Sequence, residues 1–202
     1  MRFVDYPSII RFAWADFDST RPIEQIEDIS ARVSTNHVFR ITLEGGDRVI
    51  AKLSYFGKFE HFKEDHRLIH TLANNLLYPF ENVLAKSLVK NNQVFVYRHQ
   101  FEEMDVWVVF YNPIRVAEKL PRRLEEHHIR KMGSQIAKFH KACASVSTVM
   151  PKSSKTLRSD IQDLLDLLDT DTGQYEHRMN IEALREQCNL FLEHRKKMVA
   201  NS

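Results

Sequence analysis

The sequence predicts an α+β protein in which strands come first and helices follow. Up to about Asn112, the strongest segments are short runs in which apolar and polar residues alternate, as in half-buried strands. Beyond Pro113, apolar residues recur three and four positions apart, as on one face of a helix. Because proline has no amide hydrogen, Pro113 cannot extend a strand pairing, and the change falls there. We therefore expect two regions, residues 1–112 and 113–202.

A glycine hairpin is the clearest strand signal in the first region. Residues 44–47, Glu-Gly-Gly-Asp, separate the strand-like runs HVFRITL and RVIAKLS. In the first run, Phe39, Ile41 and Leu43 share one face. The later runs NVLAKSLV, QVFVYRH and DVWVVFY predict further strands, with a turn at Lys90-Asn91-Asn92. This region is therefore expected to be a small antiparallel sheet with one helix packed on it.

Four helices are expected from the spacing of apolar residues. The first covers about 58–74 and follows the hairpin closely. After residue 113, a long helix carries the apolar stripe Ile129, Met132, Ile136, Phe139 and Cys143. The third follows candidate caps at 153–156 and is rich in leucine, and the last begins near Asn180.

Lys52 lies near the middle of a predicted strand, where water cannot easily solvate it. Alternation places Ile50, Lys52 and Ser54 on one face of that strand. One interpretation is an exposed lysine on a half-solvated sheet. The other is that this face lines a cleft that binds an anion, because an ammonium is a good point charge for phosphate oxygens. Glu64 or Asp65 on the following helix could orient such a lysine.

Composition excludes several classes of protein. The formal net charge of +2 is too small to indicate a nucleic-acid partner. Two widely spaced cysteines, Cys143 and Cys188, favour a reducing compartment and provide no disulfide framework. Neither a signal peptide nor an apolar run of membrane-spanning length is recognisable, so a cytoplasmic location without membrane contact is expected. His66 and His70 lie four residues apart, but a polar helix face is favoured over a metal site.

The order of these motifs resembles the protein-kinase-like fold, in its aminoglycoside and small-molecule phosphotransferase branch. The run from Asn36 to Lys52 resembles that branch's N-x-V/I-Y/F-x-V strand, hairpin and x-V-x-K strand. The segment DHRLIHTLAN resembles its E-x-x-L-L-x-x-L helix, and HHIRKMGSQIAKFHKAC resembles its G-x-x-L-A-x-L-H helix. The resemblance covers about residues 26–145 and depends on the order of motifs that are individually weak.

The resemblance implies that ATP with Mg2+ binds between an amino-terminal lobe and a helical carboxyl-terminal lobe. Lys52 would contact the inner phosphates. The family's helix glutamate falls on Asp65, with Glu64, rotated by about 100° around the helix, as the alternative. Ser34 and Thr35 would lie in the loop that folds over the phosphates, although this loop lacks the glycines of protein kinases.

The resemblance also implies where the adenine ring would bind. Ile50 and Val38 would cover the ring. Tyr111 and Asn112 would form the hinge between the lobes, whose backbone receives adenine. Alternatively, each of these residues belongs to the ordinary core of the sheet and has no ligand.

The sequence lacks the residues that the family uses for phosphoryl transfer. No H-x-D run occurs in the 202 residues, so neither the acceptor-orienting Asp nor the metal-holding Asn can be assigned. We expect a phosphotransferase that stops before its catalytic loop, with the acceptor undetermined. The alternative is a non-catalytic module that binds a nucleotide or a partner. An incomplete second lobe would expose apolar surface, so self-association is a further expectation.

Overall fold

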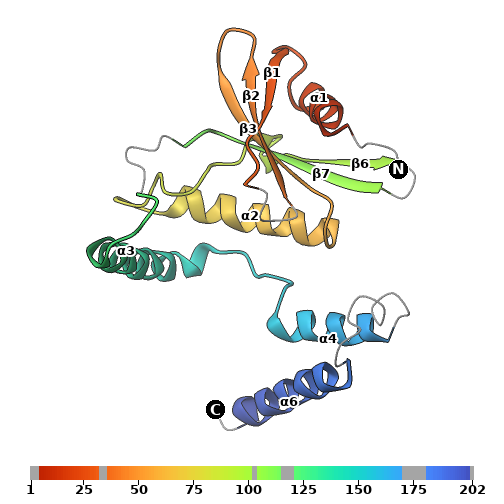
Figure 1. Ribbon diagram of the computed structural model, residues 1–202, viewed down its shortest axis with the longest axis vertical. Coiled ribbons are helices and arrows are strands. Elements are labelled where there is room, and N and C mark those ends of the chain that lie inside the picture. Colours follow the sequence, from red (N-terminus) through yellow and green to blue (C-terminus); the bar gives the residue numbers. More distant parts are fainter. Residues whose placement is uncertain (1–4, 32–35, 102–103, 115–120, 170–180, 201–202) are drawn as a thin grey trace. The chain divides into compact units, whose positions relative to one another are not determined.

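The structure is a computed structural model that describes residues 5–31, 36–101, 104–114, 121–169 and 181–200 (Figure 1). These residues form two compact units, residues 1–151 and 152–202, which are described separately. The α+β class is confirmed. The switch from strands to helices comes after Tyr111, within the first unit. Among the described helices, none has both the length and the apolar character needed to cross a membrane.

The first unit contains a five-stranded antiparallel sheet in the order β1-β2-β3-β7-β6. Its strands are β1 (Ile23–Asp28), β2 (His37–Leu43), β3 (Arg48–Ser54), β6 (Val96–Phe101) and β7 (Met104–Tyr111). A separate two-stranded hairpin consists of β4 (Val89–Lys90) and β5 (Gln93–Val94). The helices of this unit are α1 (Tyr6–Phe17), α2 (Phe59–Asn75) and α3 (Glu126–Ser145), and a 3-10 turn follows at Ser147–Val149. The central strand of the sheet is β3, which carries Lys52.

Both predicted turns are confirmed by the backbone. Between β2 and β3, Gly45 and Gly46 have φ angles of 93° and 87°, which glycine adopts without steric cost. Between β4 and β5, Asn91 and Asn92 have φ angles of 53° and 62°, a conformation that asparagine tolerates better than most residues. The NVLAKSLV run is mostly irregular, because only its last residue, Val89, enters a strand and Ser87 forms an isolated bridge to Tyr111.

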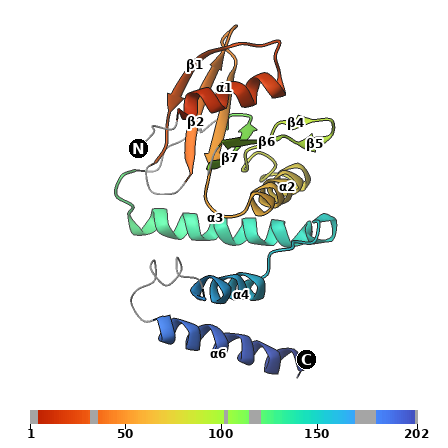
Figure 2. The ribbon, with the colours of Figure 1, turned by 90° about the vertical axis from the view of Figure 1, so that its right-hand side faces the viewer.

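The helix α1 was not predicted from the sequence, and it covers one face of the sheet (Figure 2). Its inward side consists of Ile9, Ile10, Ala13 and Trp14, all at most 5% exposed. The side chain of Asp5 accepts a hydrogen bond from the Ser8 amide and caps the first turn. The positions of the four buried residues fit a helical face, so the segment did carry a signal.

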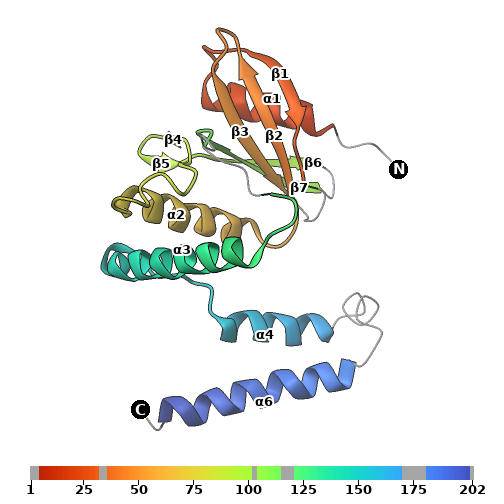
Figure 3. The same ribbon diagram turned by 60° about the vertical axis from the view of Figure 1, so that its left-hand side comes forward.

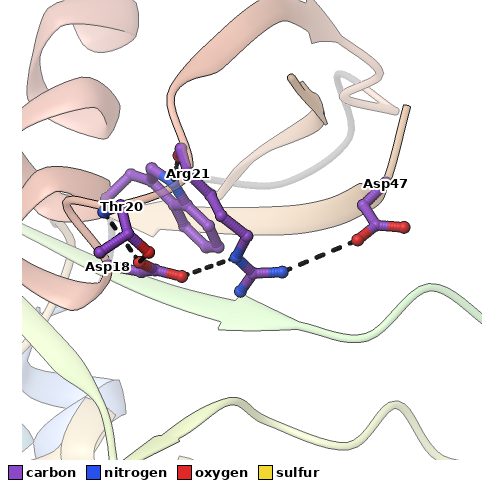
Figure 4. Close-up of polar contacts among 5 residues, drawn as sticks. Asp18, Thr20, Arg21 and Asp47 are labelled. Atoms are coloured by element: carbon purple, nitrogen blue, oxygen red, sulfur yellow. Dashed lines mark hydrogen bonds and ion pairs between the residues drawn. The ribbon is translucent and has the colours of Figure 1, made fainter. Parts of the chain in front are cut away.

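Polar contacts fasten the end of α1 to the β2–β3 hairpin (Figure 4). The indole Nε1 of Trp14 donates to the Arg21 carbonyl at 2.6 Å, and the Arg21 guanidinium lies over the same ring. Arg21 also pairs with Asp18 at 2.6 Å and with Asp47 at 3.8 Å. Hydrogen bonds from Thr20 and Arg21 lower the pKa of Asp18 to about 2.

The helix α2 packs against the opposite face of the sheet. Phe62 of α2 is buried against Trp107 and Val109 of β7. In contrast, Val106, Val108 and Phe110 of the same strand point into the α1 core. The alternation along β7 therefore divides the side chains of the first unit between two packed layers. Figure 3 shows α1 and α2 on different sides of the strands.

The long helix α3 has the predicted apolar stripe, but the stripe is not buried. Ile129, Met132 and Ile136 are 53%, 37% and 47% exposed, and none of the residues of α3 is buried. Phe139 contacts Phe80 with ring centroids 5.7 Å apart.

The second unit contains α4 (Leu157–Leu168) and α6 (Ile181–Ala200), which pack on each other. Leu165, Leu168 and Cys188 are buried in this unit. The predicted cap at Thr156 is confirmed, because its Oγ1 accepts from the Ser159 amide at 3.0 Å. The predicted start of the last helix, near Asn180, lies outside the described residues.

Candidate functional site

Lys52 lies on the face of β3 that α2 covers. In the sheet it is opposite Val38 of β2 and Val109 of β7. Its neighbours Ala51 and Leu53 point to the other face and are completely buried against α1. The predicted division of β3 into two faces is therefore correct, and the lysine lies on the inner side of a packed layer rather than on an open sheet surface.

An aromatic ring from α2 packs over the Lys52 amine. Nζ of Lys52 lies 5.6 Å from the centroid of Phe62, which is within the range of a cation–π interaction. Phe62 in turn contacts Trp107, with centroids 5.5 Å apart. The lysine is half-buried, so its stem lies in this apolar layer while part of the residue remains accessible.

Burial and a carboxylate act on the Lys52 ammonium in opposite directions. Desolvation lowers the pKa of Lys52, and the charge of Asp65 partly offsets this decrease. Asp65, on α2, is a carboxylate whose charge acts on Lys52. Of the two candidate acids, Asp65 is therefore the one whose charge acts on Lys52.

Beyond Lys52, the same face continues as a row of polar aromatic side chains. His66 of α2 is 1% exposed and lies against the Phe62 ring in a tilted arrangement, with centroids 4.1 Å apart. On its other side, His66 faces Tyr111, whose ring centroid lies 5.8 Å away. Burial raises the pKa of Tyr111. Tyr111 is paired with Ile50 across β3 and β7, so the predicted residues Ile50, Lys52 and Tyr111 lie on adjacent strands.

One backbone group of the predicted hinge is already engaged. The Asn112 amide donates to the Lys86 carbonyl at 3.0 Å. Residues 86–88 run beside the end of β7, and the Leu88 amide donates to the Phe110 carbonyl at 2.8 Å. Any adenine contact would therefore have to use a hinge group other than the Asn112 amide. Ser34 and Thr35 lie outside the described residues.

Sequence reasoning did not assign a site role to three residues that define this face. Phe62 lies in the helix predicted over about 58–74, and Trp107 in the predicted strand DVWVVFY, with no further role assigned to either. His66 was considered as a metal ligand beside His70, but it is enclosed by rings, while Nε2 of His70 lies 2.9 Å from the Asn74 side-chain nitrogen. A helical projection that continues from Phe62 to His66, four residues on, would have placed both side chains on one face.

A group of potential metal ligands occurs at the start of α3. Donor atoms of Glu125, His127 and His128 lie within 4.8 Å of one another. The Glu125 side chain accepts from the His128 amide, and Nδ1 of His128 accepts from the Glu125 amide at 3.2 Å. Two of the three side chains thus form a reciprocal capping box, which explains their proximity without a metal.

Comparisons of this chain with protein-family models, with curated proteins and with solved structures found no match. Its function must therefore be inferred from the geometry of its own residues.

Proposed function

We propose that the α2-covered face of β3 binds the phosphate groups of a nucleotide, ATP with Mg2+. In this proposal the chain is the nucleotide-binding part of a phosphotransferase that acts on a small hydroxylated molecule. One observation carries the proposal. A lysine in the centre of the sheet is half-buried under a helix, and that helix directs a carboxylate's charge toward it.

The position of Lys52 is difficult to explain by folding alone. The strand residues beside it are apolar, and burying an ammonium costs free energy that an apolar side chain would not cost. Ionisable groups with strongly perturbed environments are concentrated at functional sites, although structural ion pairs also perturb pKa values. A phosphate ligand would give the amine the anionic partner that one carboxylate supplies only in part.

Each residue on this face has a definite role in the proposal. Lys52 would neutralise phosphate oxygens, and Asp65 would hold the ammonium in position, as the lysine–acid pair does in kinases. Ile50 and Val38, both half-buried beside Lys52, would provide apolar contacts for the base. Mg2+ would be held mainly by the phosphate oxygens.

A non-catalytic role is the second candidate, and it is favoured by the missing catalytic motif. Without an H-x-D run, these residues offer no identifiable base for the acceptor hydroxyl. The proposal for these 202 residues is therefore nucleotide binding. We expect the chain by itself to convert ATP and small hydroxylated acceptors to products no faster than a protein-free control.

Calorimetric titration with ATP and Mg2+ tests the binding proposal. Lys52→Gln should weaken affinity by at least about tenfold, because a charge-assisted contact to phosphate is lost. Asp65→Asn should weaken it less, since Asp65 acts by orienting the lysine. Two matched controls on α2, Glu64→Gln and Lys63→Gln, should bind as the parent chain does. Equal affinity in the parent chain and the Lys52→Gln variant, with both folded, would remove Lys52 from this role.

A further inference from the structure

A second candidate binding site lies where β7 ends. Residues 82–86 and 112–114 surround a pocket of about 360 Å³, a volume within the range of small-molecule sites. Neither Lys52 nor Asp65 lines this pocket, so it is separate from the site proposed for nucleotide phosphates. Its described lining consists of Asn82, Leu84, Lys86, Asn112, Pro113 and Ile114.

The backbone holds the two walls of the pocket together. The Asn112 amide donates to the Lys86 carbonyl at 3.0 Å. Immediately beside this bond, Ser87 forms a bridge to Tyr111. Because these contacts fix the wall segments to each other, a ligand would meet a largely pre-formed site and would have little ordering cost to overcome.

The chemistry of the lining favours an anion with an apolar part. Lys86 is the one charged residue among the described lining residues, and the described salt bridges do not include it. The side-chain amides of Asn82 and Asn112, which also line the pocket, can donate further hydrogen bonds. Leu84 and Pro113 provide an apolar surface next to these donors.

The charge of Lys86 also acts on a neighbouring side chain. Burial is the main cause of the lowered pKa of His70, and the Lys86 ammonium lowers it further. An anion bound at Lys86 would reduce this repulsion, so His70 provides a local reporter of the site.

We propose that this pocket binds a small oxyanion joined to an apolar group, such as a phosphate monoester or a carboxylate, through the Lys86 ammonium and the two asparagine amides. The apolar group would rest on Leu84 and Pro113. The pocket shares Asn112 with the hinge that the resemblance assigns to adenine, but none of its lining residues is assigned to the nucleotide phosphates, so either site can be correct without the other.

Calorimetric titration of the full chain with phenyl phosphate, and separately with benzoate, tests this inference and distinguishes the two kinds of oxyanion. Phenol lacks the oxyanion and inorganic phosphate lacks the apolar group. Each should therefore bind more weakly than whichever of phenyl phosphate and benzoate binds. Lys86→Gln should weaken binding by at least about tenfold. Lys52→Gln and Lys138→Gln, the latter on the exposed surface of α3, should leave it unchanged.

Titration of His70 by NMR provides a second readout in the unmodified chain. Saturating probe should raise the pKa of His70, and Lys86→Gln should raise it without any probe. The inference is overturned if neither probe binds at millimolar concentration, or if both bind Lys86→Gln as tightly as the parent chain. It is also overturned if Lys52→Gln abolishes binding while Lys86→Gln does not, because the probe would then occupy the nucleotide site.

Discussion

The two faces of the five-stranded sheet are built from the same strands but differ in the residues that they hold. Toward α1, the buried cluster is entirely apolar. Toward α2, the buried apolar group is limited to Phe62, Trp107 and Val109, and polar side chains lie beside it. These polar side chains include Lys52, His66 and Tyr111.

This difference between the two faces suggests that one mainly stabilises the fold and the other is the better candidate for function. The α1 face gains stability from apolar burial, and the ionisable side chains Tyr6 and Tyr97 pack against its core while only partly buried. The α2 face gives up part of that gain to hold an ammonium and two polar rings. A packed layer that contains ionisable groups is the better place to look for function.

The largest expected effect of a single substitution is on the α1 face. Leu53→Ala removes a completely buried side chain and should lower the free energy of unfolding by about 2–5 kcal/mol, from lost apolar burial and the resulting cavity. Urea denaturation measures this change. A loss of less than about 1 kcal/mol would mean that this face is not the stabilising core.

On the α2 face, replacing Lys52, the neighbour of Leu53, should raise the free energy of unfolding rather than lower it. Lys52→Met keeps the apolar stem and removes the charge, so we expect a gain of less than about 1 kcal/mol, reduced because the lysine is only half-buried. A clear loss of stability in urea denaturation would instead give Lys52 a structural role. The same variant should lose nucleotide affinity.

The pH dependence of stability sharpens this second prediction. The pKa of Lys52 is lower in the folded chain than in the unfolded chain, so the unfolded chain binds more protons between the two values. The contribution of Lys52 to stability should therefore rise with pH from its lowered folded pKa up to about 10.4, the ordinary lysine pKa. Lys52→Met should lack this contribution, and its advantage should shrink as pH rises. A constant difference across the alkaline range would contradict the assigned desolvation.

At the rim of the α1 face, the Asp18 contacts should matter most at neutral pH. Because the folded pKa is about 2, against an ordinary value of 3.8, Asp18 stabilises the fold above about pH 4, and this contribution is lost as pH falls toward 2. Asp18→Asn should cost less than about 1 kcal/mol at pH 7, since the group lies near the surface. Thermal unfolding between pH 2 and 7 should show a smaller acid-induced loss in the variant than in the parent chain. Parallel acid curves would contradict the low pKa.

The smallest effect is expected outside both faces. Ile136→Ala on α3 should change the free energy of unfolding by no more than about 0.5 kcal/mol, because Ile136 is 47% exposed. Denaturation at several protein concentrations adds a test of the expected self-association. A loss comparable with that of Leu53→Ala, especially one that depends on concentration, would show that another surface covers this stripe.

Much of the fold could be predicted because its signals are local. Glycine and asparagine marked the two turns, since they tolerate positive φ angles. Alternation along β3 placed Lys52 and Leu53 on opposite faces. In the candidate site, the same local rule placed Ile50 beside Lys52, but it could not decide between Glu64 and Asp65, because that choice depends on how α2 is rotated against the sheet.

The sequence by itself determined which residues of β3 share a face, where the chain turns and where helices follow strands, because these features depend on neighbours a few positions apart. Only the tertiary structure decided that α1 covers one face and that the charge of Asp65 acts on Lys52. It also decided that the Asn112 amide donates to the Lys86 carbonyl. It also decided that the stripe of α3 stays exposed within the described residues. These outcomes depend on contacts between segments far apart in the chain, and local patterns contain no information about such distances.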